Sequence, residues 1–332
     1  MNRIKRQHGN LSIRLILILF VMGAVSLSAK TPYEFSVYGG GGYSTFLYRL
    51  PANSTGFTPP PLSGVKPQGM DVIAPPDGLY AIYGVSSSGI SGDLGVAFTG
   101  FVAPNIGLHV GIGLGLCNIS TNVDSLKTYT PECTLEREPH FNVYTALFDY
   151  NETHRMFNLS IPLMLQFQTA PDQRSWIRNS DFNHGVYAML GIKLNVLLSN
   201  PYESSVATGY NIAYQYPYDN WGDTQEFAGL GKFKGKSTKG DVGFIQTIFA
   251  AELGMKWRVS NKMYLYTGAY LDYGLNDPLK NSRKPTSEYI FEEYLQELSL
   301  LDFSDKTNLM TVGLKVRLAF VKAFNPLSCP QF

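Results

Sequence analysis

Hydrophobic and polar positions alternate one for one along much of this chain. Within 107–116 every even position is Leu, Val or Ile, and every odd position is Gly or His. A period of two predicts a β-strand whose two faces meet different surroundings. Together with a strand-like stretch at 34–49, the same alternation predicts eight strands in all, the others being Leu94–Val102, Gly107–Leu116, Leu159–Phe167, Val186–Leu198, Gly243–Val259, Met263–Leu275 and Met310–Phe320.

The residues on the two faces decide between a soluble barrel and a membrane barrel. On seven of the strands the apolar face carries no Asp, Glu, Lys or Arg, while the other face carries several. A soluble barrel would have to bury these charges or expose long apolar stripes, and both are costly. We therefore expect an all-β fold: an eight-stranded antiparallel transmembrane up-and-down β-barrel with long extracellular loops.

The connections between the strands favour the same architecture. Short turns at 103–105 and 260–262 alternate with long connections at 50–91, 118–155, 199–240 and 276–306. Outer-membrane barrels alternate short periplasmic turns with long outer loops, and only the 170–183 connection is long for such a turn. Phe141–Asp149 also alternates, so either the second loop continues as a hairpin above the membrane or the barrel has ten strands.

The first 29 residues read as a secretory signal. They hold four basic residues, an apolar run at Leu15–Val25 and a small-residue stretch that ends at Ala29. The alternative, a transmembrane anchor, is weaker because about 11 apolar residues are too few where roughly 20 are needed. We expect removal of residues 1–29, a barrel over 30–321 and a short periplasmic tail over 322–332. With 27 Lys+Arg against 26 Asp+Glu, the near-neutral charge argues against a nucleic-acid partner.

Three segments carry a resemblance to a known class of protein: Phe157–Phe167, Tyr270–Asp277 and Val312–Phe320. They resemble the small outer-membrane β-barrel proteins of Gram-negative bacteria, namely the OmpA transmembrane domain and the PorT-like barrels. The resemblance implies contact with outer-membrane lipid. The last strand also resembles the signal read by the barrel-assembly machinery, although any amphipathic final strand has the same pattern; the residues concerned are Thr311, Gly313, Val316, Leu318 and Phe320. The resemblance to these barrels says little about function, because one architecture hosts many functions.

The polar face predicts the contents of the lumen, since side chains fill a barrel of eight strands. If 260–262 closes a hairpin, Glu252 lies opposite Tyr270, and either Lys193 or Lys315 is its partner. Five basic groups against two acidic ones predict a salt-bridged plug or, alternatively, a narrow anion-preferring channel. The predicted lumen network is Lys193, Glu252, Lys256, Arg258, Asp272, Lys315 and Arg317.

Further expectations concern single positions and the outer loops. Pro162 has no N–H, so we expect a bulge or a missing ladder bond there. Cys117 and Cys133 are a candidate disulfide. The spacing within 288–302 predicts a short amphipathic helix at the barrel mouth. Aromatic residues of the third loop either bind an extracellular protein or glycan or pack on one another: Tyr214, Tyr216, Tyr218 and Trp221.

The sequence gives little sign of an enzyme motif. The histidines have no HExxH spacing, and no GxSxG occurs. His140, Asp149 and His154 are a faint counterpart of a catalytic rim, for which we expect surface loop positions instead. We expect no catalytic residue, metal or cofactor, and a non-enzymatic structural or surface-interaction role. The alternatives are the anion channel, a secretion or assembly accessory barrel and an outer-membrane enzyme.

Overall fold

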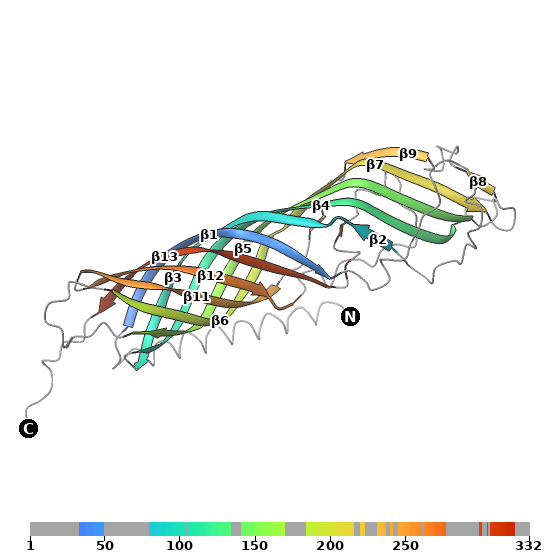
Figure 1. Cartoon of the computed structure of the whole chain (residues 1–332). Coiled ribbons are helices and arrows are strands. Elements are labelled where there is room, and N and C mark those ends of the chain that lie inside the picture. The colour runs from blue at the N-terminus through green and yellow to red at the C-terminus, as the bar shows by residue number, and fades with distance from the viewer. Residues whose placement is uncertain are drawn as a thin grey trace, which may run out of the picture.

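The fold is built from β-strands (Figure 1). The computed structural model describes residues 33–49, 80–103, 105–133, 141–169, 184–215, 220–222, 231–236, 240–241, 245–260, 262–276, 299–300, 304 and 306–322. The strands are β1 (Tyr33–Arg49), β2 (Tyr80–Tyr83), β3 (Ser86–Ala103), β4 (Ile106–Cys133), β5 (Phe141–Gln168), β6 (His184–Ser199), β7 (Pro201–Gln215), β8 (Asn220–Gly222), β9 (Gly231–Lys236), β10 (Gly240–Asp241), β11 (Ile245–Ser260), β12 (Met263–Gly274) and β13 (Lys306–Lys322). Outside the described residues lie the proposed signal, nearly all of the proposed tail and nearly all of the predicted helix at 288–302. Among the described residues, no helix is long and apolar enough to cross a membrane.

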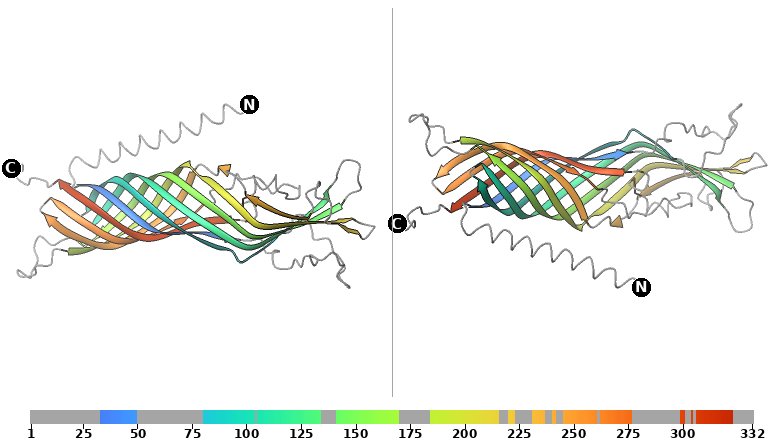
Figure 2. Two further views of the ribbon diagram at one scale, coloured as in Figure 1. Left: turned by 90° about the horizontal axis from the view of Figure 1, so that it is seen from above. Right: turned by 90° about the horizontal axis from the view of Figure 1, so that it is seen from below.

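Eight strands pair in a closed antiparallel ring. The order is β1, β3, β4, β5, β6, β11, β12 and β13, and β13 pairs back onto β1. Figure 2 shows these strands wrapping around a common axis with a steep tilt. The predicted eight-stranded antiparallel barrel is therefore confirmed, and each of the eight predicted strands lies within one member of the ring or overlaps most of it.

The pairing register sets the width of this barrel. A path of paired residues that starts at Tyr43 and crosses every strand of the ring returns to β1 at Tyr33. The shear is thus about 10 residues, and a barrel of eight strands has an interior just wide enough for side chains. Ion pathways through such an interior depend on how those side chains pair.

Two strands run far beyond the ring. β4 and β5 have 28 residues each and stay paired from Ile106–Phe167 to Cys133–Phe141. β6 ends at Ser199, and β7 continues its line along β5 from Pro201. With β2, β8, β9 and β10 at its sides, this open sheet is called the outer extension below (Figure 1). The prediction that the second loop continues as a hairpin is confirmed, so most of 118–155 is strand.

The ring is apolar outside and polar inside. Leu314 on the outer face is 72% exposed, whereas Arg317 on the inner face is 2% exposed. Outward aliphatic and aromatic side chains cover every strand of the ring. This distribution is the reverse of that in a soluble barrel.

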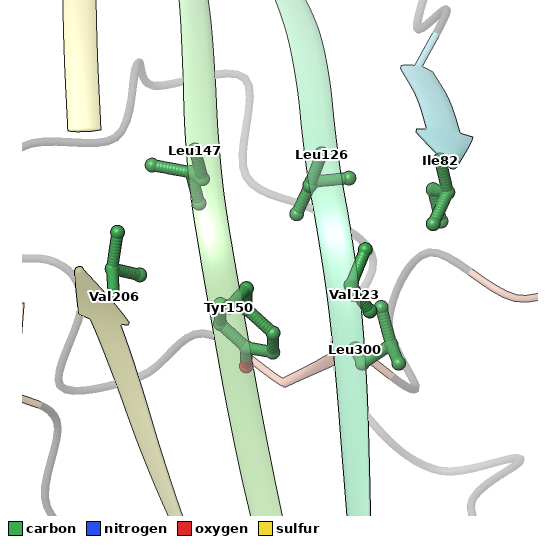
Figure 3. Packing of buried hydrophobic residues seen from close by; sticks show 7 residues of the cluster. All are labelled: Ile82, Val123, Leu126, Leu147, Tyr150, Val206 and Leu300. Atoms are coloured by element: carbon green, nitrogen blue, oxygen red, sulfur yellow. The ribbon is translucent and has the colours of Figure 1, made fainter. Parts of the chain in front are cut away.

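The outer extension has the opposite distribution. From Asn118 on β4 and Arg155 on β5 outward, the outer face carries mainly polar residues. Its inner face holds a buried apolar cluster (Figure 3): Ile82, Val123, Leu126, Leu147, Tyr150, Val206 and Leu300. Near Asp149, whose φ is 51°, the buried positions change from odd to even numbers along β4 and from even to odd numbers toward the start of β5. The backbone irregularity at Asp149 therefore coincides with a one-residue shift in which side chains of the two strands are buried.

Two expectations for single residues have clear outcomes. The β4–β5 ladder steps from Val110–Leu163 to Gly113–Ser160 without a change of register, so the missing ladder pairing at Pro162 is confirmed. The prediction of a disulfide between Cys117 and Cys133 is wrong. Cys117 is a buried free thiol, and 16 intervening steps along the single strand β4 place Cys133 roughly 50 Å away.

Candidate functional site

A carboxylate, a lysine and a tyrosine lie in contact at the end of the lumen near the short turns. Lys256 Nζ lies 2.8 Å from Glu34 Oε1, and Tyr266 donates its hydroxyl hydrogen to Glu34 Oε2 at 2.6 Å. Lys256 also donates to Gln168 Oε1 at 3.0 Å and lies 4.1 Å from the centre of the Tyr264 ring. The charges of Glu34 and Lys256 are thus compensated inside the wall.

The middle of the lumen is filled by Arg317. Its guanidinium lies 4.1 Å from the centre of the Tyr266 ring and 5.3 Å from that of Tyr187. One guanidinium N–H donates to His109 Nδ1 at 3.1 Å. Tyr187 in turn donates to Glu252 Oε1 at 2.6 Å. The guanidinium is thus held against two aromatic rings by cation–π contacts at this level.

The end of the lumen near the outer extension holds two further ion pairs. Lys193 Nζ lies 2.6 Å from Asp272 Oδ2, and Lys315 Nζ lies 3.3 Å from Asp93 Oδ2. Lys315 also lies 3.9 Å from Glu252, so Lys315 rather than Lys193 is the neighbour of that carboxylate. A cavity of about 50 Å³ beside these pairs has room for only a few water molecules.

The predicted lumen residues differ from the observed network in three places. Arg258 is exposed at the end of the barrel, beside the irregularity between Arg258 and Ser260, so its placement in the lumen was wrong. Glu34 and Asp93 belong to the network but were missed. Gly39–Gly42 hid the faces of β1, and the predicted strand began one residue after Asp93. The lumen described here holds four cations and four carboxylates: Lys193, Lys256, Lys315 and Arg317 with Glu34, Asp93, Glu252 and Asp272.

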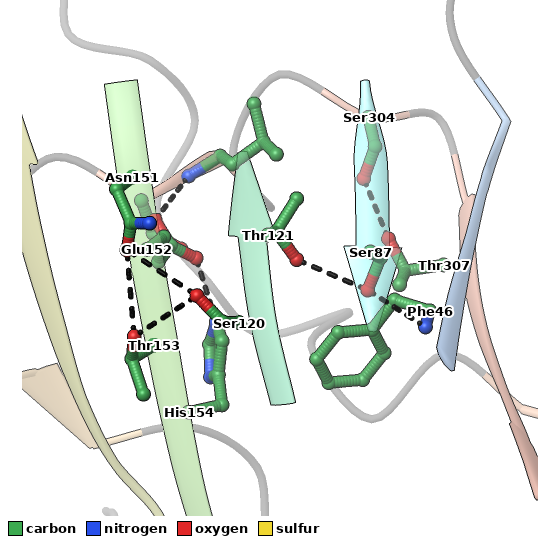
Figure 4. Close-up of polar contacts among 12 residues, drawn as sticks. Phe46, Ser87, Ser120, Thr121, Asn151, Glu152, Thr153, His154, Ser304 and Thr307 are labelled. Atoms are coloured by element: carbon green, nitrogen blue, oxygen red, sulfur yellow. Dashed lines mark hydrogen bonds and ion pairs between the residues drawn. The ribbon is translucent and has the colours of Figure 1, made fainter. Parts of the chain in front are cut away.

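A second polar cluster lies in the outer extension, on the inner face of β5. Glu152 is fully buried, at 0% exposure. Its Oε2 accepts hydrogen bonds from the Tyr150 hydroxyl at 2.6 Å and the Leu300 N–H at 2.7 Å. Its Oε1 lies 2.6 Å from His154 Nε2 and accepts from the Ser299 hydroxyl at 2.9 Å (Figure 4). One carboxylate therefore fastens residues 299–300, which precede β13, to β5.

The surroundings of Glu152 favour its charged form. Burial alone would raise the pKa of Glu152, but the hydrogen bond and charge of His154, with the bonds from Tyr150 and Leu300, hold that pKa below its usual value. Burial, followed by the charge of Glu152, raises the pKa of Tyr150. This pattern describes a satisfied structural carboxylate, because no donor in it is left exposed to a substrate.

Of the residues of the faint catalytic rim that the structure describes, only Asp149 lies at the surface. His154 is buried, with its ring 5.6 Å from Tyr202 and 5.3 Å from Phe46, so the expected surface position was wrong for this residue. Asp149 is exposed, and His140 lies outside the described residues. Within the described ranges, no group of three or more His, Cys, Asp or Glu is arranged to hold a metal ion.

The aromatic residues of the predicted third loop are partly placed. Tyr214 on β7 pairs with Trp221 on β8, which brings their backbones together at the far end of the outer extension. Tyr216 and Tyr218 lie outside the described residues.

Comparison with known proteins identifies no family. No family model matches the sequence, and no curated protein matches it. The outer membrane protein OprG from Pseudomonas aeruginosa is 10% identical over 89% of this chain and 98% of its own, with a TM-score of 0.30. Ail, the attachment invasion locus protein of Yersinia pestis, is 7% identical over 87% of this chain and 99% of its own, in its complex with the heparin analogue sucrose octasulfate, with a TM-score of 0.24. The translocator domain of the autotransporter NalP from Neisseria meningitidis is 6% identical over 95% and 96%, with a TM-score of 0.22. At these values the function has to be argued from the chain's own residues.

Proposed function

We propose that the chain is a non-enzymatic, integral outer-membrane β-barrel protein that holds a folded sheet at the cell surface and acts through that sheet. The observation that carries the proposal is the change in what the outer and inner faces of β4 and β5 carry at Asn118 and Arg155. In the ring, apolar side chains point outward and charges point inward, which suits lipid outside. Beyond Asn118 and Arg155 the apolar side chains point inward and polar ones outward, which suits water.

The contents of the lumen favour an anchor over a channel. Each lumen cation lies within 4 Å of a carboxylate or over an aromatic ring, as in Lys256–Glu34 and Arg317–Tyr266. Equal numbers of positive and negative groups also remove the basis for anion preference. The expectation of five basic against two acidic lumen groups was wrong, because Arg258 lies outside and two carboxylates were missed.

The outer extension offers the surface for a partner. An extracellular protein or glycan is the partner class that we propose, with the Tyr214–Trp221 end of the sheet as its first candidate site. Export by the signal at 1–29 and insertion by the barrel-assembly machinery belong to the same proposal.

Refolding into lipid vesicles, followed by planar-bilayer recording, tests the proposal. We expect a heat-modifiable folded species that inserts but carries no steady current. Glu252→Gln removes the carboxylate that accepts from Tyr187 and lies 3.9 Å from Lys315, which keeps Asp93 at 3.3 Å, and is expected to add brief current steps. Steady anion-selective conductance of the unmodified barrel would overturn the closed-lumen proposal, and failure to insert would overturn the membrane proposal.

A further inference from the structure

A groove of about 780 Å³ crosses the outer surface of β3, β4 and β5 at the upper edge of the apolar band. Most of its exposed lining is apolar, and Asn118 and Arg155 line its edge toward the outer extension. The outward-facing apolar side chains of the lining are Ile90, Leu94, Leu114, Leu116 and Phe157, and Ser91, Asp93 and Cys117 also contribute to it.

A missing side chain helps to create the hollow. On β3 the outward positions run Ile90, Gly92, Leu94, so the middle position of this apolar row is empty. A Cβ atom on Gly92 would come no closer than 3.4 Å to its nearest neighbour, the Gly40 carbonyl oxygen, which is ordinary contact. Gly92 does not have a left-handed backbone either, because Gly84 is the one positive-φ glycine among the described residues. Neither close packing nor backbone conformation therefore requires a glycine at position 92.

The edge of the groove nearest the outer extension carries a cation. Leu116 lies opposite Phe157 in the β4–β5 ladder, and one row further out Asn118 lies opposite Arg155. Both Asn118 and Arg155 line the groove, and the Arg155 side chain is 64% exposed. Its neighbour Glu203 is 3.8 Å away and exposed as well, a pair that solvent weakens.

We infer that this groove binds one membrane lipid with a phosphate-bearing anionic headgroup, its acyl chain over Gly92 and its phosphate at Arg155. The groove is continuous with the apolar band that faces lipid in the proposed function, on which this inference rests. Guanidinium groups pair with phosphate oxygens through two parallel hydrogen bonds, and the Asn118 amide lies opposite on the neighbouring strand. A chain in the groove would fill the position that Gly92 leaves open.

Native mass spectrometry of the full mature chain, refolded in detergent, tests the inference with dimyristoyl phosphatidylglycerol and dimyristoyl phosphatidylcholine as probes. We expect one phosphatidylglycerol to be retained about tenfold more than phosphatidylcholine. Arg155→Gln should reduce the retention of phosphatidylglycerol to that of phosphatidylcholine. Gly92→Leu should reduce the retention of both, because the new side chain fills the groove.

One further variant serves as a matched control, and a second tests the role of Arg155 from the opposite direction. Ala269→Leu adds similar bulk to an exposed outward position on β12, on the far side of the ring, and should leave retention unchanged. Glu203→Gln removes the competing carboxylate beside Arg155 and should raise phosphatidylglycerol retention.

The outcomes separate this inference from the proposed function. Equal retention of the two lipids, or retention that Arg155→Gln does not change, would overturn the inference while the barrel still inserts into vesicles. Loss of insertion by the unmodified chain would instead overturn the proposed function. If Gly92→Leu fails to give a heat-modifiable band, Arg155→Gln decides alone, because an exposed arginine is not needed for folding.

Discussion

Replacing Glu152 by Gln should release residues 299–300 from the outer extension. The carboxylate has two acceptor oxygens, each with two neighbouring donors: Tyr150 and Leu300 at one, His154 and Ser299 at the other. A glutamine amide keeps one acceptor and places an NH₂ group at the other position. At least one pair of donors must then lose its bonds inside a fully buried site.

The magnitude follows from the charge and the burial. Hydrogen bonds to a charged group contribute about 1.5–3 kcal/mol each, so the loss of the two bonds at one oxygen costs about 3–4 kcal/mol at the lower end of that range. Since each 1.4 kcal/mol is about tenfold in an equilibrium constant, local opening at Leu300 should become more frequent by a factor on the order of 100 to 1,000.

Amide hydrogen exchange measures this opening directly, because the Leu300 N–H donates to Glu152. The matched control is Glu203→Gln on β7, which removes an exposed carboxylate and should change exchange at Leu300 by less than about tenfold. Unchanged exchange at Leu300 in Glu152→Gln would refute the role of this carboxylate as a fastener.

Three further predictions follow from single residues. The pKa of Glu152 in the folded protein is held below the usual 4.5, so the stability that Glu152 contributes is complete above about pH 4.5 and is lost as the pH falls through the lower folded value. The protection of the Leu300 amide against hydrogen exchange, corrected for the intrinsic exchange rate, should therefore drop in acid for the unmodified protein but not for Glu152→Gln. Gly42→Ala should destabilise the barrel by about 1–3 kcal/mol in urea unfolding from vesicles, because its Cβ would come within 2.5 Å of the Val312 carbonyl oxygen, whereas Gly41→Ala meets nothing nearer than 3.6 Å and should unfold at nearly the same urea concentration as the unmodified protein. The buried thiol of Cys117 should react with maleimide only after unfolding, and rapid labelling of the folded barrel would contradict its position.

Much of the ring could be predicted because its signal is local. A strand exposed to different surroundings on its two faces has a period of two, so the number of ring strands and the contents of most faces can be read from neighbouring residues. The outer ends of β3, β4 and β5 were not part of the predicted ring strands, because the alternation of apolar and polar residues fades where these strands leave the apolar band. The pairing of Glu252 with Tyr270 was also within reach, because a short turn sets the register of a hairpin.

The partners inside the lumen could not be predicted in the same way. Whether Glu252 meets Lys193 or Lys315 depends on the register of every strand between them, and the shear accumulates around the whole ring. Gly39–Gly42 carry no side chain to mark a face, so the inward position of Glu34 became visible only when β1 paired with β13 and closed the ring.

The sequence by itself thus determined the strands, the two-faced barrel wall and its short turns, because each depends on residues close together in the chain. Only the tertiary structure decided the balanced lumen charges, the burial of His154 and the groove at Gly92. Each of these needs segments distant in sequence to meet, as when Ser299 reaches Glu152 from 147 positions away. Alternation along one strand carries no information about such meetings, which ring closure and the pairing of long strands create.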